Sequence, residues 1–145
     1  NKDGNITITG SQFDQNSSGS MGGAIANMSG KTDYTGEINI TDSGFTGNTA
    51  GNGGAVWNGT NGKVNFTNST FSKNTAMLED HSLQQGGAIT NGGEMTITGS
   101  TFEDNTANKR GGAIFNSGTL TVNGGSFDGN KAGNGGAIFN AGNLS

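Results

Sequence analysis

The chain has 145 residues and a formal net charge of −4, and it contains 29 Gly, no Pro and no Cys. Without Cys, disulfides, cysteine-ligated zinc and thiol nucleophiles are excluded. Seven Lys and Arg against eleven Asp and Glu do not make the basic surface that nucleic-acid phosphates require, so we expect no nucleic-acid partner. No apolar run reaches the roughly 18 residues of a membrane-spanning helix, so no membrane span is predicted.

Three short patterns recur in a constant order along the chain. An alternating stretch of apolar residues with Thr or Asn comes first, Phe-x-x-Asn follows, and Gly-Gly-Ala-[Ile/Val]-x-Asn completes the unit. Each pattern occurs five times. Ordered self-similarity of this kind is the signature of a repeat architecture, so the low hydrophobic content of 28% does not indicate disorder.

The alternating stretches open the repeats, at residues 6–9, 38–41, 64–67, 95–98 and 120–123. Apolar residues at every second position predict strands with one buried face. A short strand cannot bury its apolar face alone, but identical strands stacked in register can. We therefore predict that these five segments stack into one sheet.

Phe-x-x-Asn comes next in every repeat. In register, its Phe residues form a stacked aromatic column, and its Asn residues form a ladder in which each side-chain amide bonds the one above and below. The predicted column is Phe13, Phe45, Phe71, Phe102 and Phe127, and the predicted ladder is Asn16, Asn48, Asn74, Asn105 and Asn130.

Gly-Gly-Ala-[Ile/Val]-x-Asn closes the repeat. Gly adopts left-handed conformations freely, which favours a tight corner at this point. Its apolar residues, from Ile25 to Ile138, are predicted to point inward. Its terminal residues form a second predicted asparagine ladder, namely Asn27, Asn58, Asn91, Asn116 and Asn140.

The shortest repeat interval predicts the architecture. Gly111 and Gly135 begin consecutive motifs 24 positions apart, which is too short for a propeller blade. It fits one turn of a parallel β-helix, so the predicted fold is an all-β solenoid of about five rungs of about 24 residues with three short strands each. Longer intervals are explained by surface-loop insertions at residues 28–36, 59–63 and 77–85.

The most functional-looking position lies between Ile and Asn of the closing motif. It holds Ala26, Trp57, Thr90, Phe115 and Phe139. Strand alternation turns this position outward, which places Trp57, Phe115 and Phe139 in a candidate binding stripe on one face. Exposed aromatic stripes commonly mark protein or glycan contacts. The alternative is that insertion loops, or a neighbouring copy of the chain, bury the rings.

No catalytic or metal-binding constellation is predicted, and no cofactor. A polysaccharide-acting β-helix would need paired carboxylates, for which Glu103 and Asp128 on adjacent rungs are the best candidates. The same column holds Thr46 and Ser72, which favours a solvated outer face. The single His81 has no companion ligands, so a metal site is not expected there.

The repeated pairing of Gly-Gly-Ala-Ile with Phe-x-x-Asn resembles the repeat of the chlamydial polymorphic membrane proteins and of related autotransporter-adhesin passengers. The resemblance implies a right-handed parallel β-helix and a single segment, residues 1–145, of a longer passenger. It also implies an extracellular or cell-surface location and a structural or adhesive role. Expected partners are a protein or glycan of a host or neighbouring cell, or further copies of the chain. End-to-end stacking into filaments is the alternative, and a polysaccharide-acting enzyme is a remote one.

Overall fold

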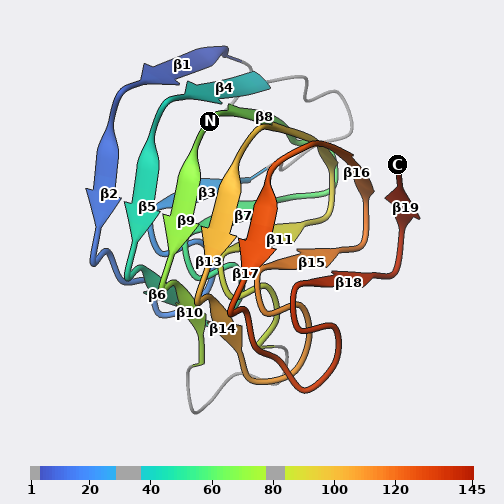
Figure 1. Ribbon diagram of the computed structural model, residues 1–145. Coiled ribbons are helices and arrows are strands. Elements are labelled where there is room, and N and C mark those ends of the chain that lie inside the picture. Colours follow the sequence, from blue (N-terminus) through green and yellow to red (C-terminus); the bar gives the residue numbers. More distant parts are fainter. Residues whose placement is uncertain (1–3, 29–36, 78–83) are drawn as a thin grey trace.

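Parallel strands form the whole regular structure of the described residues. The computed structural model describes residues 4–28, 37–77 and 84–145, and every regular element within them is a strand. Each strand pairs in parallel with the equivalent strand one turn along the chain. The chain thus coils as a parallel β-helix, with successive rungs stacked on one another (Figure 1). This confirms the predicted fold class, and its handedness stays a prediction.

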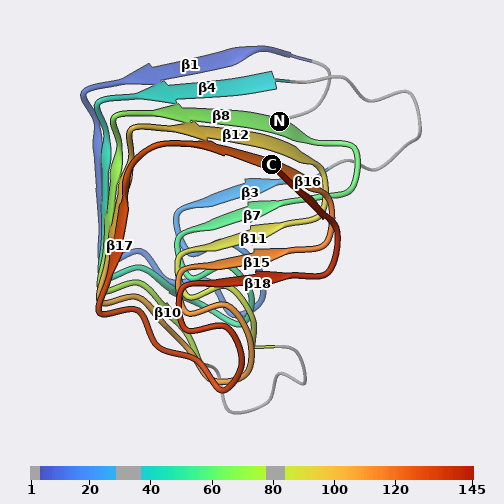
Figure 2. The same ribbon diagram turned by 45° about the vertical axis from the view of Figure 1, so that its right-hand side comes forward.

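Three sheets enclose the core of the described structure. The first and third sheets lie opposite each other, and the second joins them along one side (Figure 2). The first sheet has the order β1-β4-β8-β12-β16-β19. Its strands are β1 (Ile6–Thr9), β4 (Glu37–Thr41), β8 (Lys63–Thr67), β12 (Glu94–Thr98), β16 (Thr119–Asn123) and β19 (Asn143–Leu144).

The second and third sheets carry the Phe and Gly-Gly-Ala motifs. The strands of the second are β2 (Gln12–Asp14), β5 (Gly44–Thr46), β9 (Thr70–Ser72), β13 (Thr101–Glu103) and β17 (Ser126–Asp128). Those of the third are β3 (Ile25–Asn27), β7 (Val56–Asn58), β11 (Ile89–Asn91), β15 (Ile114–Asn116) and β18 (Ile138–Asn140). A further sheet, which the repeat pattern did not predict, consists of the two-residue strands β6 (Thr49–Ala50), β10 (Thr75–Ala76) and β14 (Thr106–Ala107).

The segment between β7 and β8 can be followed in full. It is a short turn closed by a hydrogen bond from the Gly62 amide to the Gly59 carbonyl oxygen at 2.9 Å, and Lys63 already begins β8. The other two predicted loop insertions, residues 28–36 and 77–85, lie mostly outside the described residues.

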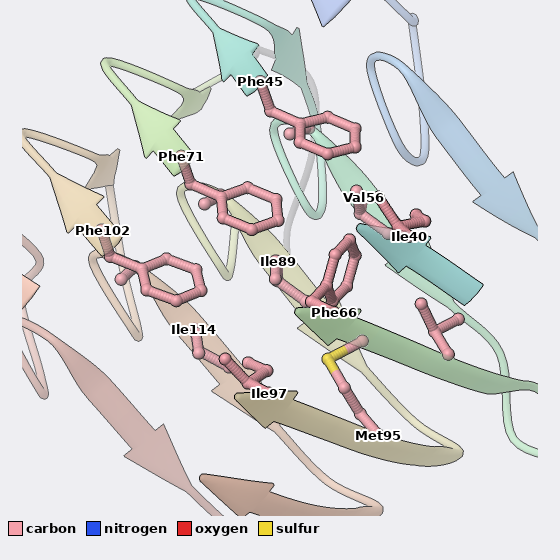
Figure 3. Packing of buried hydrophobic residues seen from close by; sticks show 14 of the residues in the cluster. Ile40, Phe45, Val56, Phe66, Phe71, Ile89, Met95, Ile97, Phe102 and Ile114 are labelled. Atoms are coloured by element: carbon pink, nitrogen blue, oxygen red, sulfur yellow. The ribbon is translucent and has the colours of Figure 1, made fainter. Parts of the chain in front are cut away.

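A column of Phe rings runs through the core. Consecutive rings from Phe13 to Phe127 are 4.7–4.8 Å apart between centroids and lie within 6° of parallel. This separation equals the spacing of adjacent strands, so the in-register pairing itself sets the stack. Phe66 of the first sheet meets Phe71 edge-on at 5.0 Å. Figure 3 shows the rings of Phe45, Phe66, Phe71 and Phe102 in the core with Ile89, Ile114 and Met95.

Side-chain amides form the predicted asparagine ladder beside the Phe column. Each Nδ2 donates to the Oδ1 of the Asn on the next rung over 2.8–2.9 Å, from Asn16 through to Asn130. Asn105 shows the full pattern. Its Nδ2 donates also to the carbonyl oxygen of Phe71, and its Oδ1 accepts from both the backbone amide and the Nδ2 of Asn74. Every polar atom of this buried side chain is therefore satisfied.

The second predicted ladder is present in the third sheet, from Asn27 to Asn140, with donor–acceptor distances of 2.7–2.9 Å. It has a direction, because each Nδ2 donates towards the following rung. Asn27 begins it, and within the described residues its Oδ1 is the one buried side-chain nitrogen or oxygen without a hydrogen bond.

The two positions of the Gly-Gly pair require glycine for different structural reasons. Gly86 has a φ of 64°, and a Cβ there would lie 2.1 Å from the carbonyl oxygen of Ile89. Gly87 needs no unusual φ, but a Cβ there would lie 2.0 Å from the carbonyl oxygen of Gly112 on the next rung. The first Gly therefore makes the corner, and the second permits the rungs to approach. Ala88 is then fully buried.

Replacing Asn105 by Leu tests the ladder. The variant removes the shared acceptor of two buried donors, the backbone N–H and the Nδ2 of Asn74, and each buried donor without a partner costs about 1–3 kcal/mol. We expect the free energy of unfolding to fall by at least about 3 kcal/mol in urea titrations. Asp104→Gly is the matched control, because Asp104 is exposed and has a φ of 53°, and its stability should stay within about 0.5 kcal/mol of the parent. Equal stability of the two variants would contradict the ladder.

Replacing Gly87 by Ala tests the inter-rung contact. The added methyl group must displace the backbone of the next rung, and we expect a loss of about 3 kcal/mol or more. Gly19→Ala is the control, because a Cβ at Gly19 meets no atom within 4 Å and its stability should change by no more than about 0.5 kcal/mol. Thermal unfolding of both variants measures the difference, and a parent-like melting temperature for Gly87→Ala would refute the close approach.

Candidate functional site

The residues of the predicted aromatic stripe share one column of the third sheet. Ala26, Trp57, Thr90, Phe115 and Phe139 are paired in register on successive strands. The neighbouring apolar column, with Val56, Ile89 and Ile114, belongs to the core. Strand alternation therefore directs the stripe to the outer face of the sheet.

The three aromatic side chains have different surroundings. Phe115 is only 9% exposed and stacks on Phe139 with 5.6 Å between ring centroids. The guanidinium of Arg110 lies 5.1 Å from the centroid of the Phe139 ring, within the range of a cation–π contact. Trp57 is half-buried and is separated from Phe115 by Thr90 on the intervening rung. Their role in binding stays a prediction.

The segment that precedes each Gly-Gly turn lies beside this column. Its residues pair between rungs through single parallel bridges, as in Met21 with Asn52 and Gln85 with Arg110. The hydroxyl of Thr90 donates to the carbonyl oxygen of Gln85 at 2.8 Å, which ties the segment to the strand. The left-handed Gly makes a tight turn, so the segment before it can run beside the third sheet and the segment after it can enter that sheet.

A groove of about 250 Å³ opens between this segment and the outer face of the third sheet, and we call it the sheet-3 groove. Aromatic side chains and uncharged polar groups line it, without a charged residue. The lining residues are Met21, Asn52, Trp57, Asn58, Gly59, Thr60, Gln85, Thr90, Gly92, Phe115 and Ser117.

Two lining amides retain hydrogen-bonding capacity. Asn52 and Gln85 are each only 7% exposed. The Oδ1 of Asn52 accepts from the backbone amide of Gln85 at 3.3 Å. Neither the Nδ2 of Asn52 nor the side-chain amide of Gln85 forms a hydrogen bond within the described part of the chain. Both residues line the sheet-3 groove, and their unbonded side-chain atoms are not fully buried, so they offer donors and acceptors to a ligand there.

Sequence reasoning found the aromatic side chains of the groove but not its amides. Asn52 and Gln85 occupy the position directly before Gly-Gly, which also holds Met21, Arg110 and Asn134. This position varies in chemistry from repeat to repeat, so no pattern singled it out. Its fixed place, directly before the Gly-Gly pair in every repeat, is the pattern that could have drawn attention to this position.

The carboxylates of the remote enzyme alternative lie elsewhere. Glu103 and Asp128 are register partners on the second sheet, and both are exposed on its outer face. Of the charged residues, Lys63 of the first sheet lies 3.8 Å from both Glu37 and Glu94, with all three side chains partly open to solvent. Exposed pairs of this kind contribute about 0–1 kcal/mol.

Comparison with known families identifies the repeat. The family described as Chlamydia polymorphic membrane protein (Chlamydia_PMP) repeat matches residues 68–92, 99–117 and 122–141. Neither curated proteins nor solved structures gave a significant match. In the described residues, no helix has the length and apolarity needed to cross a membrane. The repeat family indicates a surface or secreted, autotransporter-like protein.

Proposed function

We propose, from the premise that this chain carries the Chlamydia polymorphic membrane protein repeat, that it is an adhesive β-helical segment of a bacterial autotransporter passenger. Its role is to present binding surfaces to a host or neighbouring cell. The match to that repeat in three segments is the observation that carries the proposal.

The architecture supports a role in display. Each rung contacts mainly its neighbours, so rungs can be added to a solenoid without disturbing the rest. The inward positions are constrained by the Phe column and the two asparagine ladders, whereas outward positions vary from rung to rung. Trp57 and Thr90, for example, are register partners on adjacent strands. A rigid rod with a variable outer surface suits recognition at a distance from the cell.

End-to-end self-assembly is the second candidate function, favoured by one observation. Within the described residues, β3 pairs only with β7, and β18 pairs only with β15. One edge of each of these two strands therefore offers backbone groups to a further rung, which a second copy of the chain can supply.

We further propose that the segment has no catalytic activity. The paired carboxylates Glu103 and Asp128 lie on an exposed strand face that Ser72 and Thr46 continue. Solvated carboxylates on an open surface do not have the contrasting environments that separate a general acid from a base.

Adhesion of coated beads to cultured epithelial cells tests the proposed function. Beads coated with the chain should adhere several-fold more than beads coated with albumin, and excess soluble chain should compete. Adhesion at the albumin level would refute an adhesive role. Sedimentation velocity on the same preparation distinguishes the second candidate, because filaments would appear as large species that grow with protein concentration.

A further inference from the structure

The sheet-3 groove combines aromatic faces with unpaired amides, and this combination indicates the class of its ligand. Trp57 and Phe115 lie two rungs apart, a span of about 10 Å at the usual strand spacing. The intervening Thr90 has its hydroxyl engaged by Gln85. Phe139 is partly covered by Arg110, so Trp57 and Phe115 are the aromatic side chains that line the groove.

A turn makes room for the Trp57 side chain. A Cβ at Gly59 would lie 2.8 Å from Cη2 and 2.9 Å from Cζ3 of the Trp57 ring. Glycine at this position therefore lets the indole lie close against the backbone of the turn. Gly59 itself lines the groove with Thr60, so the indole stands at the side of the groove rather than projecting freely into solvent.

We propose that the sheet-3 groove binds a neutral oligosaccharide. The proposal rests on the adhesive function above, for which it names the ligand class. Sugar rings present apolar C–H faces that pack on aromatic rings, and hydroxyls that both donate and accept hydrogen bonds. The half-buried Trp57 supplies most of the aromatic surface, since Phe115 is only 9% exposed, and the amides of Gln85 and Asn52 supply partners for hydroxyls.

Two other ligand classes fit the groove less well. An anionic ligand would need a cation, but the lining residues carry no charge, and the guanidinium of Arg110 lies over Phe139. An extended peptide commonly binds by adding a strand to an open sheet edge. Strands β7, β11 and β15 are each paired on both sides, so their backbones offer no such edge.

Fluorescence of Trp57 tests the proposal directly, because it is the single Trp of the chain and lines the groove. The whole chain is titrated with cellobiose, lactose and N,N′-diacetylchitobiose, and separately with a heparin-derived disaccharide. At least one neutral disaccharide should change the emission saturably, with a Kd on the order of 1 mM for so small a ligand. The heparin disaccharide should produce no saturable change.

Matched variants locate the binding. Gln85→Leu keeps the size of the side chain but removes its amide, and should weaken binding at least about tenfold. Thr98→Ala, on the outer face of the first sheet, should bind as the parent does. Trp57→Ala, followed by saturation-transfer NMR, should lose binding. A melting temperature near that of the parent establishes that each variant is folded. If Gln85→Leu does not fold, the loss of binding by Trp57→Ala tests the proposal.

The outcomes separate this inference from the adhesive function. No saturable response to any neutral disaccharide, parent-like binding by Gln85→Leu and Trp57→Ala, or a response to the heparin disaccharide alone would overturn the saccharide proposal. Bead adhesion that persists in those cases would leave the adhesive role standing, with a protein ligand or another surface. If the chain binds a neutral disaccharide but the coated beads do not adhere, the adhesive role is refuted and the saccharide site stands.

Discussion

Hydrogen bonding between identical side chains on successive rungs is the constraint on which this structure depends. Beside the apolar core, the amide side chains of Asn48, Asn74 and Asn105 are fully buried. Burying an amide without partners costs several kcal/mol in an apolar medium. The ladder avoids this cost because each amide donates and accepts along the stack, and it does so only when the rungs remain in register. The Phe column reinforces the same register, since its 4.7–4.8 Å spacing is that of the strands.

This constraint divides the surface into fixed and free positions. Corners need a left-handed residue or a missing Cβ, and the Gly-Gly pair meets both needs at the entry to each strand of the third sheet. Outward positions escape these demands, so Trp57, Thr90 and Phe115 can follow one another in one column. The sheet-3 groove lies where the segment before the Gly-Gly turn runs beside the outward, variable column of the third sheet. Recognition chemistry can therefore vary without altering the fold.

The sequence was sufficient to predict the strands of the three main sheets, the ladders and the outward column, because each follows from the period of the repeat. The left-handed corners within Phe-x-x-Asn were not predictable, since Gln15 and Lys73 adopt a positive φ that their residue types do not favour. The two-residue strands such as Thr75–Ala76 have too little pattern to be recognised. The groove depends on how the chain returns after the Gly corner, and on Arg110 reaching Phe139. These are tertiary features, which no local pattern encodes.

Hydrogen exchange of the Asn side-chain amides, followed by NMR, tests the central claim most directly. The account predicts that the Nδ2 protons of Asn74 and Asn105, which are fully buried in the ladder, exchange orders of magnitude more slowly than those of the exposed Asn68 and Asn123. Only opening of the stack should release the ladder protons. Equal exchange rates for the two groups would contradict the ladder as the interaction that holds the rungs in register.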